Sequence, residues 1–452
     1  MMVGNVKRSE GTHHHIILEV VVTVLNGILL RRATGKGALA ATLVICLAAP
    51  AQAQQVRELS LVHGLGASQH KALSELAENF NGSQKQVRVV VTQGKVDQEA
   101  LPDMFILEGA DTESFLRGKP RFKPLAAAMR EAKVPLKTAK GPQGLVDRDI
   151  VDAKGALQAL PIGLATPVLY VNRDILRGAG LDPETPLATW DDMQPIIGRL
   201  AQSGSKCPFT FMQPASTLVE NLNAWHNEPN VVIENKVEQL AFNGMLAVKH
   251  LAKLATWQTA GLLRVFGSDQ EAVTAFRNGQ CAMLTGPSSL WRELREDAGR
   301  DYRVTVLPYH EGTYGAPQNT LASGAALWLA SGRKAADYKA MASFVDYWLQ
   351  PKNQVAWQLE TGYLPLNRAG YFAAQSDLLG EELENVRVAV AQLGHKVPTN
   401  ESSSSIVMGR AATHAAIDAA LGSLWSGQKP AKKALDDAVS ELRATAAAPA
   451  AR

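Results

Sequence analysis

Aromatic residues beside predicted turns are the feature of this sequence best suited to binding a ligand. An aromatic ring packs against the apolar C–H face of a polyol or sugar, while serine, glutamate and backbone groups bind its hydroxyls. Taken singly, each is more often a core residue, because its large apolar area favours burial. The residues concerned are Trp190, Trp225, Trp291, Tyr309, Trp328 and Tyr363.

Sequence motifs for covalent, nucleotide or metal chemistry are missing. There is no G-x-x-x-x-G-K-[ST], H-E-x-x-H or G-x-S-x-G, and no G-x-G-x-x-G follows a predicted strand. Glu108 and Asp111 offer a carboxylate pair, but nothing places them in the geometry of a glycosidase. We therefore expect no catalytic residue, no metal and no cofactor, and a protein that is not an enzyme.

The length, composition and charge of the chain limit the possible number of lobes and the possible binding partners. The chain has 452 residues, 46% hydrophobic and 20% charged, which is enough for a buried core and favours two lobes. Residues 54–452 carry 41 cationic and 41 anionic side chains, so the excess of positive charge belongs to the first 53 residues. A neutral chain without a basic block gives no support for nucleic-acid binding.

The N-terminal segment predicts export. Arg31, Arg32 and Lys36 precede a short apolar run at 37–49, and the small-residue motif at 51–53 completes the pattern of a signal peptide. The run is too short to span a bilayer. We interpret residues 1–30 as an over-extended start, and we expect cleavage near Ala53 and a periplasmic location.

Two cysteines remain beyond the predicted leader, Cys207 and Cys281. An exported protein with an even number of cysteines is a candidate for a disulfide. The alternative is a pair of buried thiols. We predict the disulfide, because each cysteine lies at the edge of a predicted strand.

Alternation of strands and helices predicts an α/β protein with largely parallel sheets. Residues 58–63 and 86–91 alternate like strands, and 103–107 is a short apolar run. Thr189 can cap a helix that ends near Ser203. Further helices are predicted at about 67–80, 235–256, 334–349, 351–360 and 408–425.

A block of motifs carries a resemblance to a known family. Leu160–Pro161 is followed by Thr166–Asp174 (TPVLYVNRD), Ala179–Pro183 (AGLDP) and Thr189–Trp190. This block resembles the extracellular solute-binding proteins of ABC importers, the maltose-binding-like family. Further segments resemble the branch of that family that binds sn-glycerol 3-phosphate in the periplasm; they are 204–207, 220–225, 276–283, 308–309, 316–319, 324–328, 361–365 and 424–427.

The resemblance covers essentially all of residues 56–445 and implies the type II periplasmic binding protein fold. That fold is α/β, with two lobes of mostly parallel sheets, flanking helices and a hinge that the chain crosses more than once. The implied division is a leader at 1–53, an N-lobe of 54–163 with 304–349, a C-lobe of 164–303 with 350–445, and a frayed tail at 446–452.

The resemblance matches individual ligand-binding residues of the branch to residues of this sequence. The implied ligand-binding residues are Glu108, Trp190, Ser288, Ser289, Gly324 and Tyr363. Trp190 and Tyr363 are expected to face the cleft from the C-lobe, with Glu108 opposite on the N-lobe. Of the two serines, Ser288 is the better match.

The sequence departs from the branch where a phosphate would bind. A tyrosine of the branch aligns with Val96, a serine with Ala165 and the phosphate-binding arginine with Ile406, and a helix is missing between 97 and 102. Arg410, one helical turn beyond Ile406, is the candidate to replace the lost cation, and Lys95 is the alternative.

These observations lead to one expectation about function and to its alternatives. The expected ligand is sn-glycerol 3-phosphate or a glycerophosphodiester, delivered by a monomer to ABC permease subunits at the inner membrane. The alternative ligand is a neutral polyol or sugar, since the departures remove charge and hydroxyls from the site. An exported enzyme and a scaffold that binds no solute are the remaining classes.

Overall fold

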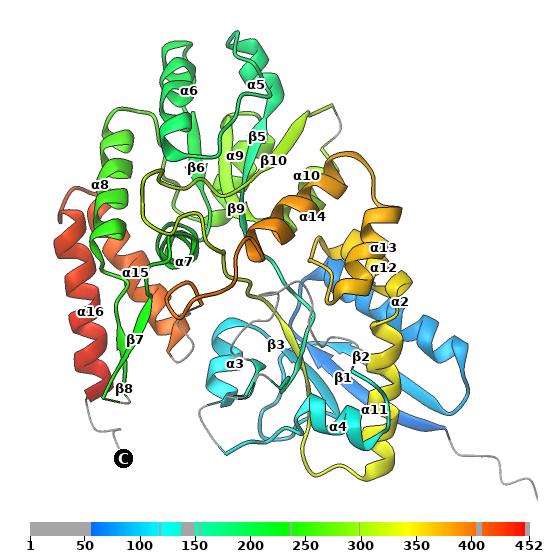
Figure 1. Ribbon diagram of the computed structural model, residues 1–452. Coiled ribbons are helices and arrows are strands. Elements are labelled where there is room, and N and C mark those ends of the chain that lie inside the picture. The colour runs from blue at the N-terminus through cyan, green and yellow to red at the C-terminus, as the bar shows by residue number, and fades with distance from the viewer. Residues whose placement is uncertain are drawn as a thin grey trace, which may run out of the picture. The chain divides into compact units, whose positions relative to one another are not determined.

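The computed structural model describes residues 56–116, 119–136, 150–152, 154, 156–235, 237–297, 299–403 and 409–447 (Figure 1). The leader predicted over residues 1–53 and the end of the predicted tail, 448–452, lie outside the described residues. Within the described part, no helix is long and apolar enough to cross a membrane.

The N-lobe is built on a mixed sheet whose described strands run in the order β2-β1-β3-β11-β4. The first three are parallel, and β11 is antiparallel to both of its neighbours. All four residues of β3 are buried, as expected of a central strand. The strands are β1 (Arg57–His63), β2 (Val87–Gln93), β3 (Met104–Leu107), β4 (Leu160–Pro161) and β11 (Ala326–Leu329).

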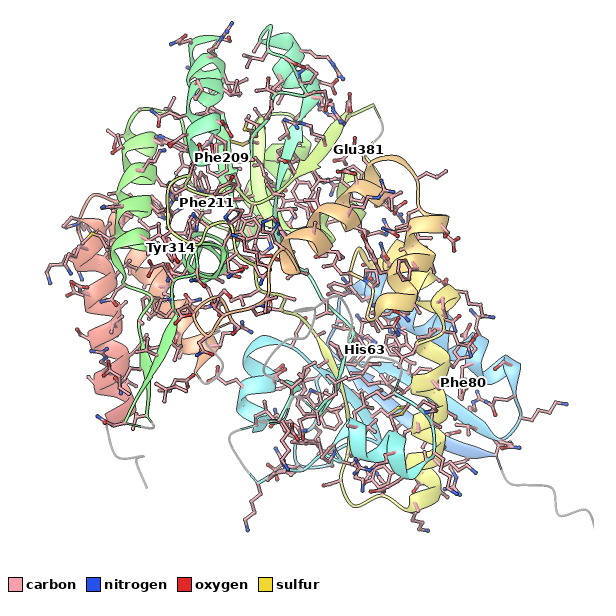
Figure 2. The ribbon with its side chains drawn as sticks, viewed as in Figure 1. His63, Phe80, Phe209, Phe211, Tyr314 and Glu381 are labelled. Atoms are coloured by element: carbon pink, nitrogen blue, oxygen red, sulfur yellow. A yellow bond between two sulfur atoms is a disulfide. The ribbon has the colours of Figure 1, made fainter. Side chains whose placement is uncertain are left out.

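Helices α2 (Ala67–Ser83), α3 (Gly109–Leu116), α4 (Leu125–Glu131) and α11 (Ala335–Trp348) belong to this lobe. The predicted apolar stripe of α2 is confirmed, because its buried residues are those that recur at helical spacing. These residues are Ala72, Leu73, Leu76, Ala77 and Phe80. Figure 2 shows Phe80 in the N-lobe, where its ring meets Phe344 of α11 edge-on at 5.2 Å.

The C-lobe is built on a second mixed sheet with described strands in the order β10-β5-β9-β6. Strand β5 is antiparallel to both neighbours, and β6 is parallel to β9. The strands are β5 (Pro167–Asn172), β6 (Phe209–Phe211), β9 (Met283–Pro287) and β10 (Tyr302–Thr305). A separate hairpin consists of β7 (Val231–Glu234) and β8 (Val237–Leu240).

Helix α6 (Trp190–Gln202) shows why the C-lobe helices begin where they do. The Thr189 hydroxyl accepts a hydrogen bond from Asp192 N at 2.9 Å, and the Asp192 carboxylate accepts one from Thr189 N at 3.0 Å. This capping box confirms the predicted start of the helix. The other C-lobe helices before residue 300 are α5 (Arg173–Gly178), η2 (Ala215–Glu220), α7 (Asn221–Trp225), α8 (Met245–Thr259), α9 (Asp269–Arg277), η3 (Ser288–Leu290) and α10 (Trp291–Leu294).

The C-terminal third is helical in its described part. Its helices are α12 (Pro351–Thr361), α13 (Arg368–Asp377), α14 (Gly380–Leu393), α15 (Arg410–Trp425) and α16 (Ala431–Ala447). Helix α16 was not predicted from the sequence, and it reaches into the segment expected to be frayed. It packs on α15 and carries the i,i+4 ion pairs Lys432–Asp436 and Lys433–Asp437.

The expectation of mostly parallel sheets is confirmed, because all described strands but one run in the same direction in each sheet. The exceptions, which make both sheets mixed, are β11 and β5. The chain passes between the sheets at 162–166, returns at 306–325 and leaves the N-lobe core again after α12. A strand entered by such a crossing is free to run antiparallel to its neighbours, as β5 and β11 do. The crossing segments also contact one another, since Ala165 pairs with Ser323 and Leu364 N donates to Leu164 O at 2.8 Å.

The expected lobe boundaries need two corrections. Helix α12 was assigned to the C-lobe, but its Trp357 lies in the N-lobe core, with its ring 4.9 Å from that of Trp348. The indole N–H of Trp357 donates to Ile162 O at 2.8 Å, which ties α12 to the end of the N-lobe sheet. Thr305 was assigned to the N-lobe, but it pairs with Leu169 in the C-lobe sheet.

A disulfide joins Cys207 and Cys281, whose Cα atoms are 4.5 Å apart. Cys207 lies just before β6 and Cys281 just before β9, and these two strands pair in parallel. The bond therefore links the starts of two neighbouring strands of the C-lobe sheet.

Candidate functional site

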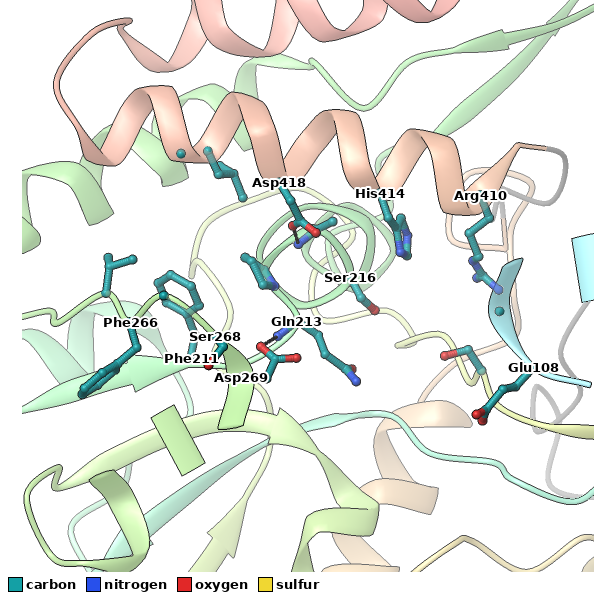
Figure 3. Close-up of a pocket in the computed structure, with 18 of the residues that line it drawn as sticks. Glu108, Phe211, Gln213, Ser216, Phe266, Ser268, Asp269, Arg410, His414 and Asp418 are labelled. Atoms are coloured by element: carbon teal, nitrogen blue, oxygen red, sulfur yellow. Dashed lines mark hydrogen bonds between the residues drawn. The ribbon is translucent and has the colours of Figure 1, made fainter. Parts of the chain in front are cut away.

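A cavity of about 1010 Å³ lies between residues of the N-lobe sheet and residues of the C-lobe (Figure 3). From the N-lobe come the end of β3, the start of α3 and the crossing segment before β11. From the C-lobe come the turn between β6 and η2, the loop before α9 and one face of α15. In Figure 3, Arg410, His414 and Asp418 point from α15 into this space. The volume suits a ligand of disaccharide or phosphodiester size.

Glu108 lies on the cavity, as expected, directly after strand β3. Burial, together with the nearby charge of Asp111, raises the pKa of its carboxyl group. The carboxyl oxygens of Glu108 can accept hydrogen bonds from ligand hydroxyls.

Gly324 also lies on the cavity, where two crossing segments touch. A Cβ atom on Gly324 would lie 1.6 Å from the carbonyl oxygen of Gly163. Only glycine permits this approach, so Gly324 fixes the spacing of the segments beneath the cavity.

Arg410 lines the cavity as the first residue of α15, after Gly409 at φ 73°. Its Nη2 lies 3.2 Å from Oε1 of Glu220, and Nε2 of His414 lies 2.9 Å from the other oxygen of the same carboxylate. Glu220 is only 1% exposed. A buried carboxylate therefore holds the two basic side chains of α15 that face the cavity. Ile406, the residue aligned with the family arginine, lies outside the described residues.

Trp190 does not line the cavity, so its expected position facing the cleft is wrong. Its side chain is 1% exposed and lies in the C-lobe core. The rings of His250, Phe209 and Trp257 surround it at 4.7, 5.9 and 6.1 Å. Although Trp190 is the first residue of α6, His250 and Trp257 of α8 pack against its indole ring.

Tyr363 was expected on the C-lobe side of the cleft, but it lies on the N-lobe side. Its ring packs against the N-lobe core and stacks on Trp357 with centroids 6.4 Å apart. Burial and the nearby Glu108 raise the pKa of its phenol to about 12. It lies close to Glu108 but does not line the cavity.

Ser288 and Ser289 lie at the end of β9 and do not line the cavity. Ser288 is fully buried; its N–H donates to Thr166 O at 2.9 Å, and its carbonyl accepts from Asn385 Nδ2 at 3.0 Å. These contacts make it part of the hinge, because Thr166 belongs to a segment that crosses between the sheets. The two serines were expected to bind the ligand, but neither belongs to the wall of this cavity.

The cavity end away from Arg410 combines aromatic rings with carboxylates. Phe211 and Trp425 lie with ring centroids 5.7 Å apart. Asp269 accepts a hydrogen bond from Gln213 N at 2.8 Å, and Asp418 accepts one from Ala215 N at 3.0 Å. Burial and the nearby Asp269 raise the pKa of Asp418.

Sequence reasoning missed several residues around the cavity because no local pattern marks them. Glu220 lies 190 residues from Arg410 in the chain, and Glu113 lies 298 residues from Ala411, whose N–H donates to it. Only the fold brings these pairs together. Among the residues that the structure describes, no group of three or more His, Cys, Asp or Glu is arranged to hold a metal ion.

Comparisons with known proteins agree on one family. A sequence profile described as bacterial extracellular solute-binding protein matches residues 75–374. The sn-glycerol-3-phosphate-binding periplasmic protein UgpB of Pectobacterium atrosepticum is 30% identical over 405 residues, covering 86% of this chain and 91% of that protein. The protein of the same name from Yersinia pseudotuberculosis is 27% identical over 412 residues, covering 88% and 94%.

Solved structures share the fold at low sequence identity. UgpB from Mycobacterium tuberculosis in complex with glycerophosphocholine matches with a TM-score of 0.67 and 16% identity, covering 86% of this chain and 98% of that one. An ABC substrate-binding protein from Listeria monocytogenes in complex with cycloalternan matches with a TM-score of 0.66 and 18% identity, covering 86% and 99%. These likenesses show a common architecture.

Proposed function

The chain belongs to the bacterial extracellular solute-binding proteins, and we propose that it is the substrate-binding subunit of an ABC importer that captures a glycerophosphodiester or sn-glycerol 3-phosphate in the periplasm. Capture is non-covalent, and a monomer delivers the solute to the permease subunits. The observation that carries the proposal is the cavity of about 1010 Å³ with Arg410 on its wall, in a chain whose relatives are named for binding this solute.

The chemistry of the cavity supports a ligand with a phosphate group and hydroxyls. Arg410 presents a guanidinium that can donate hydrogen bonds to phosphate oxygens while Glu220 holds it in place. Glu108, across the cavity from Arg410 in Figure 3, can accept from hydroxyls of a glycerol moiety. We therefore propose that phosphate lies near Arg410 and that glycerol lies toward Glu108.

A neutral polyol or sugar is the second candidate ligand. The aromatic pair Phe211 and Trp425 on the cavity wall suits the apolar face of a sugar ring. Structural neighbours that share the fold were solved with sugars, among them cycloalternan and α-D-tagatose.

A binding panel tests the proposal. Protein purified without refolding is analysed by mass spectrometry for bound solute, then titrated calorimetrically with glycerophosphodiesters, sn-glycerol 3-phosphate, glycerol and maltose. Micromolar or tighter binding of a phosphorylated ligand is expected. If only neutral sugars bind, the ligand assignment fails. Chemical turnover of a ligand would indicate an enzyme, and binding of none of them would indicate a scaffold.

The variant Arg410→Ala tests the placement of phosphate. Its affinity for a phosphorylated ligand should fall about tenfold or more, because a charge-assisted hydrogen bond contributes about 1.5–3 kcal/mol. Affinity for neutral polyols should change little. The matched control is Arg387→Ala on α14, an exposed arginine that does not line the cavity. Equal losses in the two variants would contradict the placement.

A further inference from the structure

The start of helix α15 is the part of the cavity where an anion would ordinarily bind. The first four N–H groups of a helix have no partner within the helix, and the helix dipole adds partial positive charge there. Helix α15 has 16 residues, and its first residue, Arg410, lines the cavity. An incoming phosphate would therefore find both N–H donors and a guanidinium at this place.

A carboxylate of the protein already occupies this position. The backbone N–H of Ala411, the second residue of α15, donates to Oε2 of Glu113 at 2.9 Å. Glu113 belongs to α3 of the N-lobe, lines the same cavity and is only 6% exposed. The hydrogen bond thus joins the N-lobe to the first turn of a C-lobe helix and uses a donor that phosphate would need.

Arg410 is similarly engaged by a carboxylate, because Glu220 lies 3.2 Å from its guanidinium. The charged and titratable side chains on the cavity wall, within the described residues, are Glu108, Glu113, Asp269, Arg410, His414 and Asp418. Carboxylates therefore outnumber the basic groups, even before Glu220 is included. A ligand with two negative charges meets more repulsion here than a ligand with one.

We propose that Glu113 is a selectivity residue that disfavours phosphomonoester dianions and so restricts the site to phosphate ligands with a single negative charge, the phosphodiesters. The inference rests on the proposed function and narrows its substrate class. A phosphomonoester carries nearly two charges at neutral pH, since its second pKa is near 6. A phosphodiester has no second acidic proton and keeps one charge. A monoanion can accept a hydrogen bond from Arg410 with its single charge, whereas the second charge of a dianion adds repulsion from the carboxylate of Glu113.

The variant Glu113→Gln tests this role. Its amide oxygen can still accept from Ala411 N–H, so the variant removes the charge and retains the hydrogen bond. Calorimetric titration at pH 7.5 with sn-glycerol 3-phosphate and with glycerophosphoglycerol, a diester without a cationic headgroup, gives the ratio of their dissociation constants. We expect wild type to prefer the diester at least tenfold, and Glu113→Gln to reduce that preference about tenfold by tightening monoester binding.

The matched control is Asp111→Asn, which removes an exposed carboxylate of the same helix that does not line the cavity. Asp111→Asn should change the ratio of dissociation constants less than threefold. If it changes the ratio as much as Glu113→Gln does, the net charge of the region sets the selectivity instead of the position of Glu113, and the proposal is overturned. An unchanged ratio in Glu113→Gln overturns it too, while diester binding by wild type leaves the proposed function intact. If neither wild type nor variant binds any phosphorylated ligand, both fail. If the amide variant does not fold, the ratio is measured in Glu113→Ala, which removes the charge and also frees the Ala411 N–H, and it should fall there too.

Discussion

Glu220 is the residue on which the basic side of the cavity depends. Its carboxylate is buried and contacts Arg410 through one oxygen and His414 through the other. Removing one partner of a buried ion pair leaves a desolvated charge and commonly costs about 3–5 kcal/mol. The arginine is therefore held in one orientation before ligand arrives, which lowers the entropy lost on binding.

Trp190→Phe separates a core role from a binding role. Trp190 is enclosed by Phe209, His250 and Trp257, so a smaller ring should leave a void and lower the free energy of unfolding by about 1–3 kcal/mol. Affinity for ligand should stay within about threefold of wild type. Urea unfolding followed by circular dichroism and calorimetric titration measure the two quantities.

Trp328→Phe, in the core of the N-lobe, is the matched control and should behave in the same way. A tenfold loss of affinity in Trp190→Phe alone, with little loss of stability, would return Trp190 to the binding site.

Motif matches predicted the place of Glu108 and Gly324 on the cavity, and helical spacing from Ile406 predicted that of Arg410, whereas Trp190 and Ser288 do not line it. The difference has a physical cause. Position within an element does not separate the two groups, because Trp190 begins α6 just as Arg410 begins α15. The surroundings of Trp190 and Ser288 come from distant segments, such as α8 and the crossing segment at 162–166, which no local pattern reveals.

At the scale of helices and strands, local sequence predicted those structural features that depend on residues within a single element. The stripe of α2 and the capping box of Thr189 with Asp192 depend on residues within a turn or two, so they were predictable. The direction of β5 and β11 depends on how the chain crosses between the sheets, so it could not be predicted from local sequence. Helix α16 was missed even though it carries an apolar stripe that packs on α15. The residues of this stripe recur at helical spacing and are buried; they are Ala431, Ala434, Leu435, Ala438 and Val439.

The disulfide should make a large contribution to the stability of the C-lobe sheet. Cys207 and Cys281 are 74 residues apart, and closing a loop of this length stabilises by about 4 kcal/mol in the chain-entropy account. The double variant Cys207→Ser/Cys281→Ser should lose about that much free energy of unfolding in urea. Dithiothreitol should lower the stability of wild type and leave the variant unchanged. A loss below about 1 kcal/mol would show that pairing of β6 with β9 holds this region without the covalent bond.

On the scale of the whole molecule, histidines buried in a neutral state couple the fold to pH. In the C-lobe, His310 N donates to Nε2 of His226 at 2.7 Å, and Nδ1 of His250 lies 3.0 Å from Nε2 of His310. Burial, with contributions from neighbouring basic groups, lowers the pKa of His226 and of His310 to about 4 and also lowers that of His250. In the N-lobe, burial lowers the pKa of His63 to about 4.

These shifts predict that the folded state loses stability as the pH falls from about 6.5 to about 4. In that window the unfolded chain, with histidine pKa values near 6.5, binds protons that the folded chain does not, so acid favours unfolding. Each such histidine contributes up to about 1.4 kcal/mol per pH unit.

In His226→Gln, whose amide oxygen can still accept from His310 N–H, the slope of unfolding free energy against pH should decrease by up to that amount between pH 6.5 and 4. Urea unfolding at half-unit pH steps measures the slope, and the range from pH 7.5 to 8.5, where histidine is neutral in both states, is the internal control. Because carboxylates titrate in wild type and variant alike, the difference between the two slopes isolates His226, and parallel curves would mean that His226 is protonated in the folded protein.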